Sequence, residues 1–321
     1  MKTRIYIDGY NLYYGVLKNT PYKWLDPIAL VKSAITNSVP ANILAELDDV
    51  VITKYFTSEV IPKITFSATA ATDQKAYHQA LQCIYPEDML TIILGTHTVN
   101  PVTLRQVDPM RPKELHAGCP QVNVWRIEEK QTDINIAVHA LMDAFSDSSP
   151  QHFVFVSNDT DLCPLLDALQ KLAHIKTGVI APVDGIYRHQ ATDLARRVDW
   201  AKKEIKPEEL KAAQLALRID HSVRTELKSS IRKPLEWFGA KELSGQIFEI
   251  LFAVMEKRNK VFQWLEQQPV KDAIDGIPDL TSPAIYLLDD VDTAELVLIH
   301  AQAYADYVSK NGKRQHAPTK S

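Results

Sequence analysis

Apolar runs alternate with segments of helical spacing through the first two hundred residues. Runs rich in β-branched and aromatic residues predict strands at residues 5–8, 50–57, 90–99, 122–127, 152–157 and 177–181. Apolar residues three or four positions apart predict helices at 10–18, 72–85, 132–145 and 162–172. Strands that alternate with helices favour an α/β fold with a doubly wound, mainly parallel sheet flanked by helices.

The segment 132–145 has the clearest helical pattern. Its apolar residues share one stripe, which predicts a strongly amphipathic helix that packs through this face: Ile134, Ala137, Val138, Leu141, Met142 and Phe145. Just before it, residues 100–120 predict a long basic loop or hairpin. The basic residues of that segment are Arg105, Arg111, Lys113 and His116.

The alternation fades after about residue 200, and the chain becomes helical in character. We therefore predict three parts: an α/β domain at 1–200, a helical extension at 201–309, and a basic, disordered tail at 310–321. Eight large apolar residues of the extension predict a second small core: Trp237, Phe238, Ile247, Leu251, Phe252, Met255, Phe262 and Trp264. A later helix is predicted at 293–308. The C-terminal helices are predicted to mediate contact with a second copy of the chain, contact with a protein partner, or selection of the substrate.

Composition narrows the class of protein only a little. The chain is 45% hydrophobic and 24% charged, and its net charge of −4 excludes the strongly basic signature of a non-specific nucleic-acid binder. Three widely spaced cysteines predict neither a disulfide framework nor a zinc knuckle and favour a reducing compartment. The first residues lack a signal-peptide pattern, and no apolar segment is long enough for a membrane span. We expect a cytoplasmic protein without membrane contact.

Four aspartates stand where predicted strands give way to helices: Asp8, Asp133, Asp159 and Asp161. In open α/β sheets, ligands bind at the carboxyl ends of the strands, so these carboxylates should converge. Converging carboxylates repel one another unless one is protonated or a cation lies between them. Oxygen ligands without cysteine or paired histidine favour Mg²⁺ or Mn²⁺, and such ions suit phosphoryl chemistry.

Each aspartate, taken singly, has a structural interpretation as a helix cap. Asp8 and Asn11 could cap the helix that follows the first strand, and Asp133 alone fits a cap better than a ligand. Of the pair after the fifth strand, one aspartate could serve as a cap, which leaves the other unexplained. Asp8, Asp133 and Asp159 are the predicted direct or water-mediated ligands, and Asp161 could instead serve the helix beside it. Further residues are predicted to support the site or contact substrate: Asn11, Lys130, Ser157 and Asn158.

Three blocks, IYIDGYNLYYG, EEKQTDINIAVHALMDAF and FVFVSNDTDLCPLLDAL, together resemble the NYN domain family of PIN-like metal-dependent nucleases. The resemblance covers roughly residues 1–217. It implies helices around a parallel sheet, acidic metal ligands at Asp8, Asp133, Asp159 and Asp161, and cleavage of RNA that depends on Mg²⁺ or Mn²⁺. Two family glycines are replaced here, by Gln131 and Asn158. No carboxylate is replaced, so the departures concern the shapes of the loops.

Three functional hypotheses remain open. The first is an endoribonuclease in which one or two Mg²⁺ or Mn²⁺ ions activate water against single-stranded or structured RNA. The second is an NADH-dependent monooxygenase of the 6-hydroxy-3-succinoylpyridine type, because some sequences with the same DGYNLYYG and KWLDP segments carry that label. The chain has no GxGxxG motif after a strand to support this chemistry. The third is a non-catalytic RNA-binding regulatory module.

Overall fold

The computed structural model describes residues 1–321 except 66, 115–117, 221–229, 256, 268–277 and 312–321. The chain forms two compact units. The first comprises Met1–Val16, Asp26–Ala213 and Ile219–Ile231, and the second comprises Leu17–Leu25, Gln214–Arg218 and Arg232–Ser321. The domain boundaries expected from the sequence stay predictions. None of the helices in the described ranges combines the length and apolar character that a membrane span requires.

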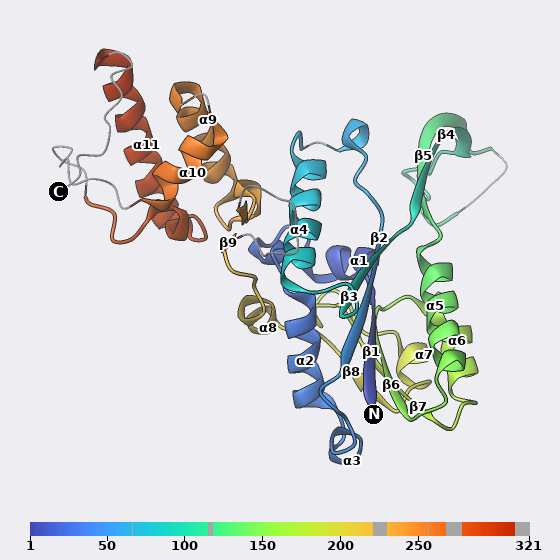
Figure 1. Cartoon of the computed structure of the whole chain (residues 1–321). Helices are drawn as coiled ribbons and strands as arrows, with labels where there is room; N and C mark the ends of the chain where they lie inside the picture. The colour runs from blue at the N-terminus through green and yellow to red at the C-terminus, as the bar shows by residue number, and fades with distance from the viewer. Residues whose placement is uncertain (66, 115–117, 221–229, 256, 268–277, 312–321) are drawn as a thin grey trace. The chain divides into compact units, whose positions relative to one another are not determined.

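A six-stranded parallel sheet forms the centre of the first unit (Figure 1). Its strand order is β3-β2-β1-β6-β7-β8. The strands are β1 (Lys2–Asp8), β2 (Val51–Thr57), β3 (Leu90–Leu94), β6 (Gln151–Val156), β7 (Ile175–Ile180) and β8 (Trp200–Lys202). From β1 the chain builds outward through β2 and β3, then returns to the other side of β1 with β6. The predicted doubly wound α/β fold is confirmed, and its topological switch point lies between β1 and β6.

Helices cover both faces of this sheet (Figure 1). Helices α2 (Pro27–Ser38) and α4 (Ala70–Ile84) lie on one face, and α5 (Thr132–Ser146), α6 (Cys163–Leu169) and α7 (Thr192–Ala195) lie on the other. All six residues of β6 are buried, as expected for a strand covered on both sides. The core beneath α5 and α6 contains Tyr6, Phe153 and Phe155, and the Tyr6 and Phe155 rings stack at 5.0 Å between centroids.

Short elements complete the first unit. After β1 the chain forms α1 (Gly9–Leu12) and then a π-helical turn at Tyr13–Leu17, in place of the single helix predicted at residues 10–18. The others are α3 (Ala41–Leu44), α8 (Pro207–Ala212) and 3₁₀ turns at Pro62–Ile64 and Thr160–Leu162. Gly9 matters because a Cβ there would lie 2.7 Å from the carbonyl oxygen of Phe56. The close approach of α1 to the end of β2 therefore requires glycine.

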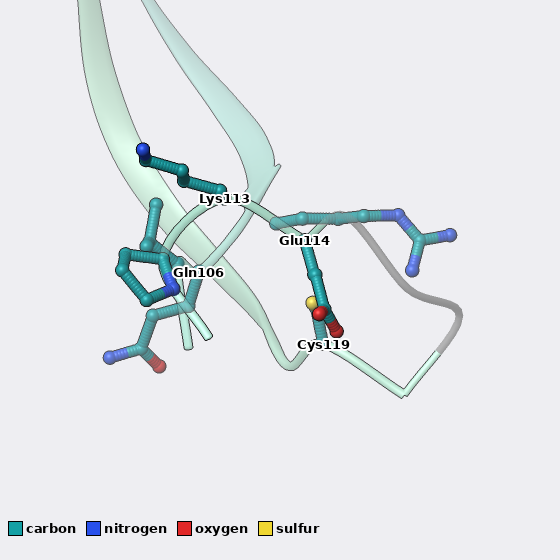
Figure 2. Close-up of a pocket in the computed structure, with 7 residues that line it drawn as sticks. Gln106, Lys113, Glu114 and Cys119 are labelled. Atoms are coloured by element: carbon teal, nitrogen blue, oxygen red, sulfur yellow. The ribbon is translucent and has the colours of Figure 1, made fainter. Parts of the chain in front are cut away.

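An antiparallel hairpin, β4 (Thr96–Arg105) with β5 (Gln121–Lys130), projects from the unit (Figure 1). The expected strand at 90–99 is therefore two strands, of which β3 joins the main sheet and β4 does not. Residues 100–105 of the expected loop are also β-strand, and His116 lies outside the described residues. The hairpin tip holds a small hollow, shown in Figure 2, lined by Arg105, Gln106, Val107, Pro112, Lys113, Glu114 and Cys119. Ten residues of strand separate it from the hairpin base by about 30 Å, so it contains none of the predicted site residues.

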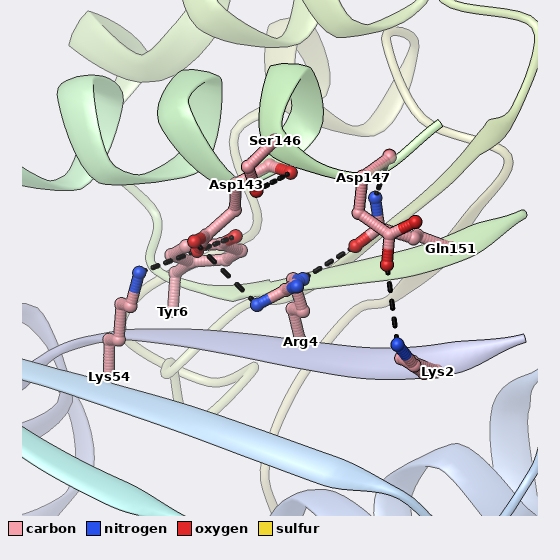
Figure 3. A network of polar contacts seen from close by, with 8 residues as sticks. All are labelled: Lys2, Arg4, Tyr6, Lys54, Asp143, Ser146, Asp147 and Gln151. Carbon is pink, nitrogen blue, oxygen red and sulfur yellow. Dashed lines mark hydrogen bonds and ion pairs between the residues drawn. The ribbon is translucent and has the colours of Figure 1, made fainter. Parts of the chain in front are cut away.

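Helix α5 packs through a different face from the one its sequence favoured. Its fully buried residues are Thr132, Ile136, Ala140 and Ala144, with Ala137 and Leu141 partly buried. Four residues of the predicted stripe are instead exposed: Ile134, Val138, Met142 and Phe145. The polar contacts of Asp143 explain which face of α5 is buried (Figure 3). Asp143 accepts hydrogen bonds from Tyr6 Oη (2.8 Å) and Lys54 Nζ (2.6 Å) on the sheet, which turns its side of the helix inward.

The second unit is built from α9 (Lys241–Met255), α10 (Arg258–Glu266) and α11 (Val291–Asn311). A two-residue ladder of β9 (Arg218–Ile219) and β10 (Ile231–Arg232) precedes them. The core of the second unit contains four of the eight residues expected, Phe238, Ile247, Leu251 and Phe262, while Trp237, Met255 and Trp264 are partly buried and Phe252 is exposed. Lys233 is buried beside Asp289, with its Nζ 4.5 Å from the centroid of the Phe238 ring. Residues 312–321 of the predicted tail lie outside the described residues.

Candidate metal centre

The ends of β1 and β6 lie side by side, because these strands are neighbours in register. Ile7 pairs with Val156, which places Asp8 level with Ser157 at the carboxyl edge of the sheet. Ser157 Oγ donates a hydrogen bond to Asp8 Oδ2 (3.1 Å). The backbone N–H of Asn158 donates to Asn11 Oδ1 (3.1 Å). The structure therefore joins the first and third sequence blocks at the topological switch point, where open α/β sheets bind ligands.

Asp8 is almost completely buried, with 3% of its surface exposed. Its Oδ1 accepts the backbone N–H of Asn11 (2.9 Å), so it caps α1 as the structural interpretation expected. Burial raises the pKa of Asp8, and the negative charge of Asp159 raises it further, while the hydrogen bonds from Asn11 and Ser157 oppose the shift. Capping and metal binding are thus compatible roles, because a cation would relieve the cost of this buried charge.

Asp159, rather than Asp161, serves as the cap after β6. Asp159 Oδ1 accepts the backbone N–H of Asp161 (3.0 Å), and its own N–H donates to Ser157 Oγ (3.1 Å). Asp161 is exposed. Asp161 lies in the first turn but is not its N-cap, because the tight turn after β6 brings the earlier carboxylate to the first helical N–H group.

Asn158 fixes the loop that follows β7. Its Nδ2 donates to the carbonyl oxygen of His189 (3.1 Å), and its Oδ1 accepts the N–H of Ala191 (2.7 Å). An asparagine here makes two side-chain hydrogen bonds that the family's glycine cannot make. The replacement therefore fixes the loop after β7 to the end of β6 through two hydrogen bonds.

Asp133 completes the acidic group from the first turn of α5. Its pKa is raised from 3.8 to about 6, first by burial and then by the negative charges of four other carboxylates: Asp8, Asp159, Glu129 and Asp161. The other three predicted aspartates therefore lie close enough to Asp133 to act on it electrostatically. Asp133 is not the N-cap residue, so a capping role does not explain it. The chain delivers it from the β4–β5 hairpin and not from a strand of the main sheet.

Glu129 and His97 are site neighbours that the sequence did not indicate. They face each other across the base of the hairpin. Glu129 accepts a hydrogen bond from Thr132 Oγ1, and His97 Nε2 lies 2.9 Å from Tyr10 Oη. Glu129 precedes Asp133 by four residues. The face of the hairpin that its side chain occupies depends on the strand register, which the sequence alone did not establish. Gly95 permits this arrangement, since a Cβ there would lie 2.5 Å from Glu129 Oε1.

Lys130 points away from the carboxylates, because successive side chains of a strand face opposite sides. Its Nζ pairs with Glu128 at 3.0 Å. Contact between Lys130 and a substrate phosphate stays a prediction that would require this pair to open. The positive charge that balances the acidic group must then come from elsewhere.

The donor set fits a hard divalent cation. Asp8, Asp133 and Asp159 offer only oxygen atoms, which Mg²⁺ and Mn²⁺ prefer. Among the residues that the structure describes, no three acidic, histidine or cysteine side chains are close enough to hold one ion together. Mg²⁺ usually binds through one or two carboxylates and keeps several waters, so a site for this ion does not require three side chains on one ion. Which of the four aspartates bind metal stays a prediction.

A pH-dependent stability difference is expected from Asp133. The folded-state pKa of Asp133 is raised to about 6. Between pH 4 and 6 the folded protein therefore binds a proton that the unfolded chain lacks. The stability that this proton contributes is lost as pH rises through 6. In chelator at pH 7, Asp133→Asn should be more stable than the parent by about 1 kcal/mol, after allowance for solvent screening of a partly exposed group. The gain should vanish at pH 4. Urea unfolding of both proteins at the two pH values measures it, and an equal gain at both would contradict the assignment.

Gln131 has a left-handed backbone, with φ +82° and ψ −17°. This is the position where the family has glycine, and a side chain there costs about 1–2 kcal/mol. Gln131→Gly should raise the free energy of unfolding by about 0.5–1 kcal/mol, because the greater freedom of glycine in the unfolded chain offsets part of the relief. Gln131→Ala keeps the Cβ and should give no gain. Thermal unfolding compares the three proteins, and equal effects of glycine and alanine would refute the strain.

Three comparisons place the chain among known proteins. The protein described as 6-hydroxy-3-succinoylpyridine 3-monooxygenase HspA, from Pseudomonas putida (strain DSM 28022 / S16), is 35% identical over 276 residues, 83% of this chain and 85% of that protein. The crystal structure of a protein of unknown function, VPA0982 from Vibrio parahaemolyticus RIMD 2210633, matches with a TM-score of 0.36 and 16% identity, over 64% of this chain and 94% of that one. The family model of the NYN domain matches residues 2–199. With this match and the relative at 35% identity, the chain belongs to the NYN domain family.

Proposed function

We propose that the protein is an endoribonuclease that depends on Mg²⁺ or Mn²⁺. The observation that carries the proposal is the placement of Asp8 beside Ser157 at the switch point, with the carboxylates of Asp8 and Asp159 close enough to Asp133 to raise its pKa. Such a group favours a bound cation. Membership of a nuclease-related family supports the same reading.

Asp8, Asp133, Asp159 and Asp161 are the residues that would hold the ion, directly or through water molecules. When bound, the ion would stabilise charge on a scissile phosphate and lower the pKa of an attacking water. The chain's own contribution is to keep the carboxylates in place. Ser157 holds the side chain of Asp8 and the backbone of Asp159, and Asn11 ties the loop after β1 to the loop after β6.

A group of tyrosines beside the site supports binding of single-stranded or loop RNA. Tyr10 and Tyr14 stack at 5.8 Å between ring centroids, and Tyr13 meets Tyr14 edge-on at 5.1 Å. Tyr13 and Tyr14 are 37% and 46% exposed. Exposed rings of this kind stack on unpaired bases of any sequence.

The test uses the purified full-length chain with labelled unstructured RNA, hairpin RNA and single-stranded DNA of matching sequence. Each is incubated with Mn²⁺, with Mg²⁺ or with chelator. We expect cleavage of RNA that requires a divalent ion and stops in chelator. Cleavage that persists in chelator would overturn the proposal. RNA binding without cleavage in every metal would favour a non-catalytic regulatory module.

A second candidate is hydroxylation of a pyridine, because the relative named as a monooxygenase is 35% identical over a length that extends beyond the NYN match. The chain would be incubated with 6-hydroxy-3-succinoylpyridine and NADH in air. Loss of NADH absorbance that requires the pyridine, with a hydroxylated product in the mass spectrum, would favour this function. Loss of NADH without the pyridine, or none at all, would remove it.

A further inference from the structure

Helix α5 exposes its most hydrophobic line to solvent. Ile134, Val138, Met142 and Phe145 are 68%, 47%, 63% and 73% exposed, and they lie within an arc of about 80° on the helix. We call these four residues the α5 seam. The opposite side of α5 is already buried in the core of the first unit. A helix that is apolar on both sides is normally covered on both sides.

The seam fits a protein surface better than a nucleic acid. The only charged residues of α5 are Asp133 in its first turn and Asp143, whose side chain is 14% exposed and bound to Lys54. Nucleic acids are held mainly through basic side chains, and the seam has none. Residues 312–321 have the sequence GKRQHAPTKS, which contains no large apolar side chain that could cover the seam.

The spacing of the seam makes it complementary to itself. If two α5 helices cross antiparallel about a twofold axis near residue 140, Ile134 meets Phe145 of the second copy and Val138 meets its Met142. Each pair then occurs twice, as a twofold interface requires. Pairing a large side chain with a smaller one also fills the space between the helices evenly.

The exposed area of the seam suits a stable dimer. Its four side chains expose about 450 Å² of apolar surface per protomer, from ordinary side-chain areas of roughly 150–200 Å² and the exposed fractions above. Apolar atoms make up about 60% of a typical interface, so this area implies roughly 750 Å² per partner. That is the standard size for a specific complex.

We propose that the α5 seam is the interface of a homodimer in which two copies of this chain pair antiparallel through α5. Asp133 directly precedes Ile134, so the interface begins beside the acidic group of each copy. Phe145 of the second copy would form one wall next to Asp133. The proposal does not depend on the reaction that this group performs.

Sedimentation of the full-length chain over about 1–100 µM tests the proposal. The chain mass is 36.2 kDa, and we expect the parent protein to sediment as a dimer. Val138→Glu and Met142→Glu should each raise the dimer dissociation constant at least about 100-fold, because each buries an unpaired charge. Val138→Lys combined with Met142→Glu should restore the dimer. The lysine of each copy then lies opposite the glutamate of the other copy, so two ion pairs form.

Ile299→Glu on α11 is the matched control, because Ile299 is an exposed apolar residue (48%) of the second unit. It should leave the dimer intact. Circular dichroism verifies that every variant is folded. A monomeric parent protein would overturn the proposal, as would a dimer that survives both single substitutions in α5 or that Ile299→Glu disrupts.

Discussion

Asp8→Asn is expected to lower metal-dependent RNA cleavage on the order of 10²–10³-fold while the protein stays folded. Asparagine can still accept the N–H of Asn11 through its oxygen and can contact Ser157 through its nitrogen, so the cap on α1 survives. The substitution removes a buried carboxyl group, and burial raises the pKa of that group. Stability should therefore hold or improve as activity falls. Cleavage rates at saturating Mn²⁺, with thermal unfolding of the same samples, measure both effects.

Glu128→Gln is the matched control for Asp8→Asn. It removes one carboxylate from the hairpin, but from the face that pairs with Lys130 and Arg126 and not from the acidic group. It should not lower the cleavage rate, because Glu128 belongs to a surface ion pair that faces away from the acidic group. Equal losses from both substitutions would show that the switch point is not the active site.

Asp143→Ala is expected to destabilise the fold by about 3 kcal/mol. Asp143 joins α5 to two strands: its carboxylate lies 2.6 Å from Lys54 Nζ and 3.6 Å from Arg4 Nη1, and it accepts from Tyr6 Oη (Figure 3). The Lys54 and Arg4 side chains are only 16% and 13% exposed. Alanine would leave two largely buried cations and a buried hydroxyl without their common partner. Denaturant unfolding monitored by circular dichroism measures the loss.

Asp147→Ala tests whether the loss is specific to the buried network. Asp147 directly follows α5 and pairs with Lys2 at 3.3 Å, but the Lys2 side chain is 45% exposed (Figure 3). Water can replace this contact, so the unfolding midpoint should shift far less than for Asp143→Ala. Similar shifts for both variants would mean that the Asp143 network contributes no more than a surface pair.

Local pattern was enough to predict five of the six strands of the sheet and three of the five helices that cover it, but not β8, α2 or α7. The run FVFV of β6 is buried on both faces, and only a central strand of a parallel sheet requires such an uninterrupted apolar sequence. Asp8 and Asp159 could be placed at one edge because the end of a strand is also the end of its apolar run. The same pattern failed where one polar contact outweighs hydrophobic periodicity. The contacts of Asp143 hold its side of α5 against the sheet. Ile136, Ala140 and Ala144 are therefore buried, and four residues of the predicted stripe are exposed.

The amino-acid sequence by itself determined the fold class, the family and the approximate position of the acidic group, because apolar runs and strand ends are local features. The tertiary structure decided what depends on distant partners. It paired β1 with β6, made β4 and β5 a separate hairpin, and brought Glu129 beside Asp133. It also gave the capping position after β6 to Asp159. These outcomes depend on strand register and on the direction of individual side chains, and a single residue of register changes which face a side chain occupies.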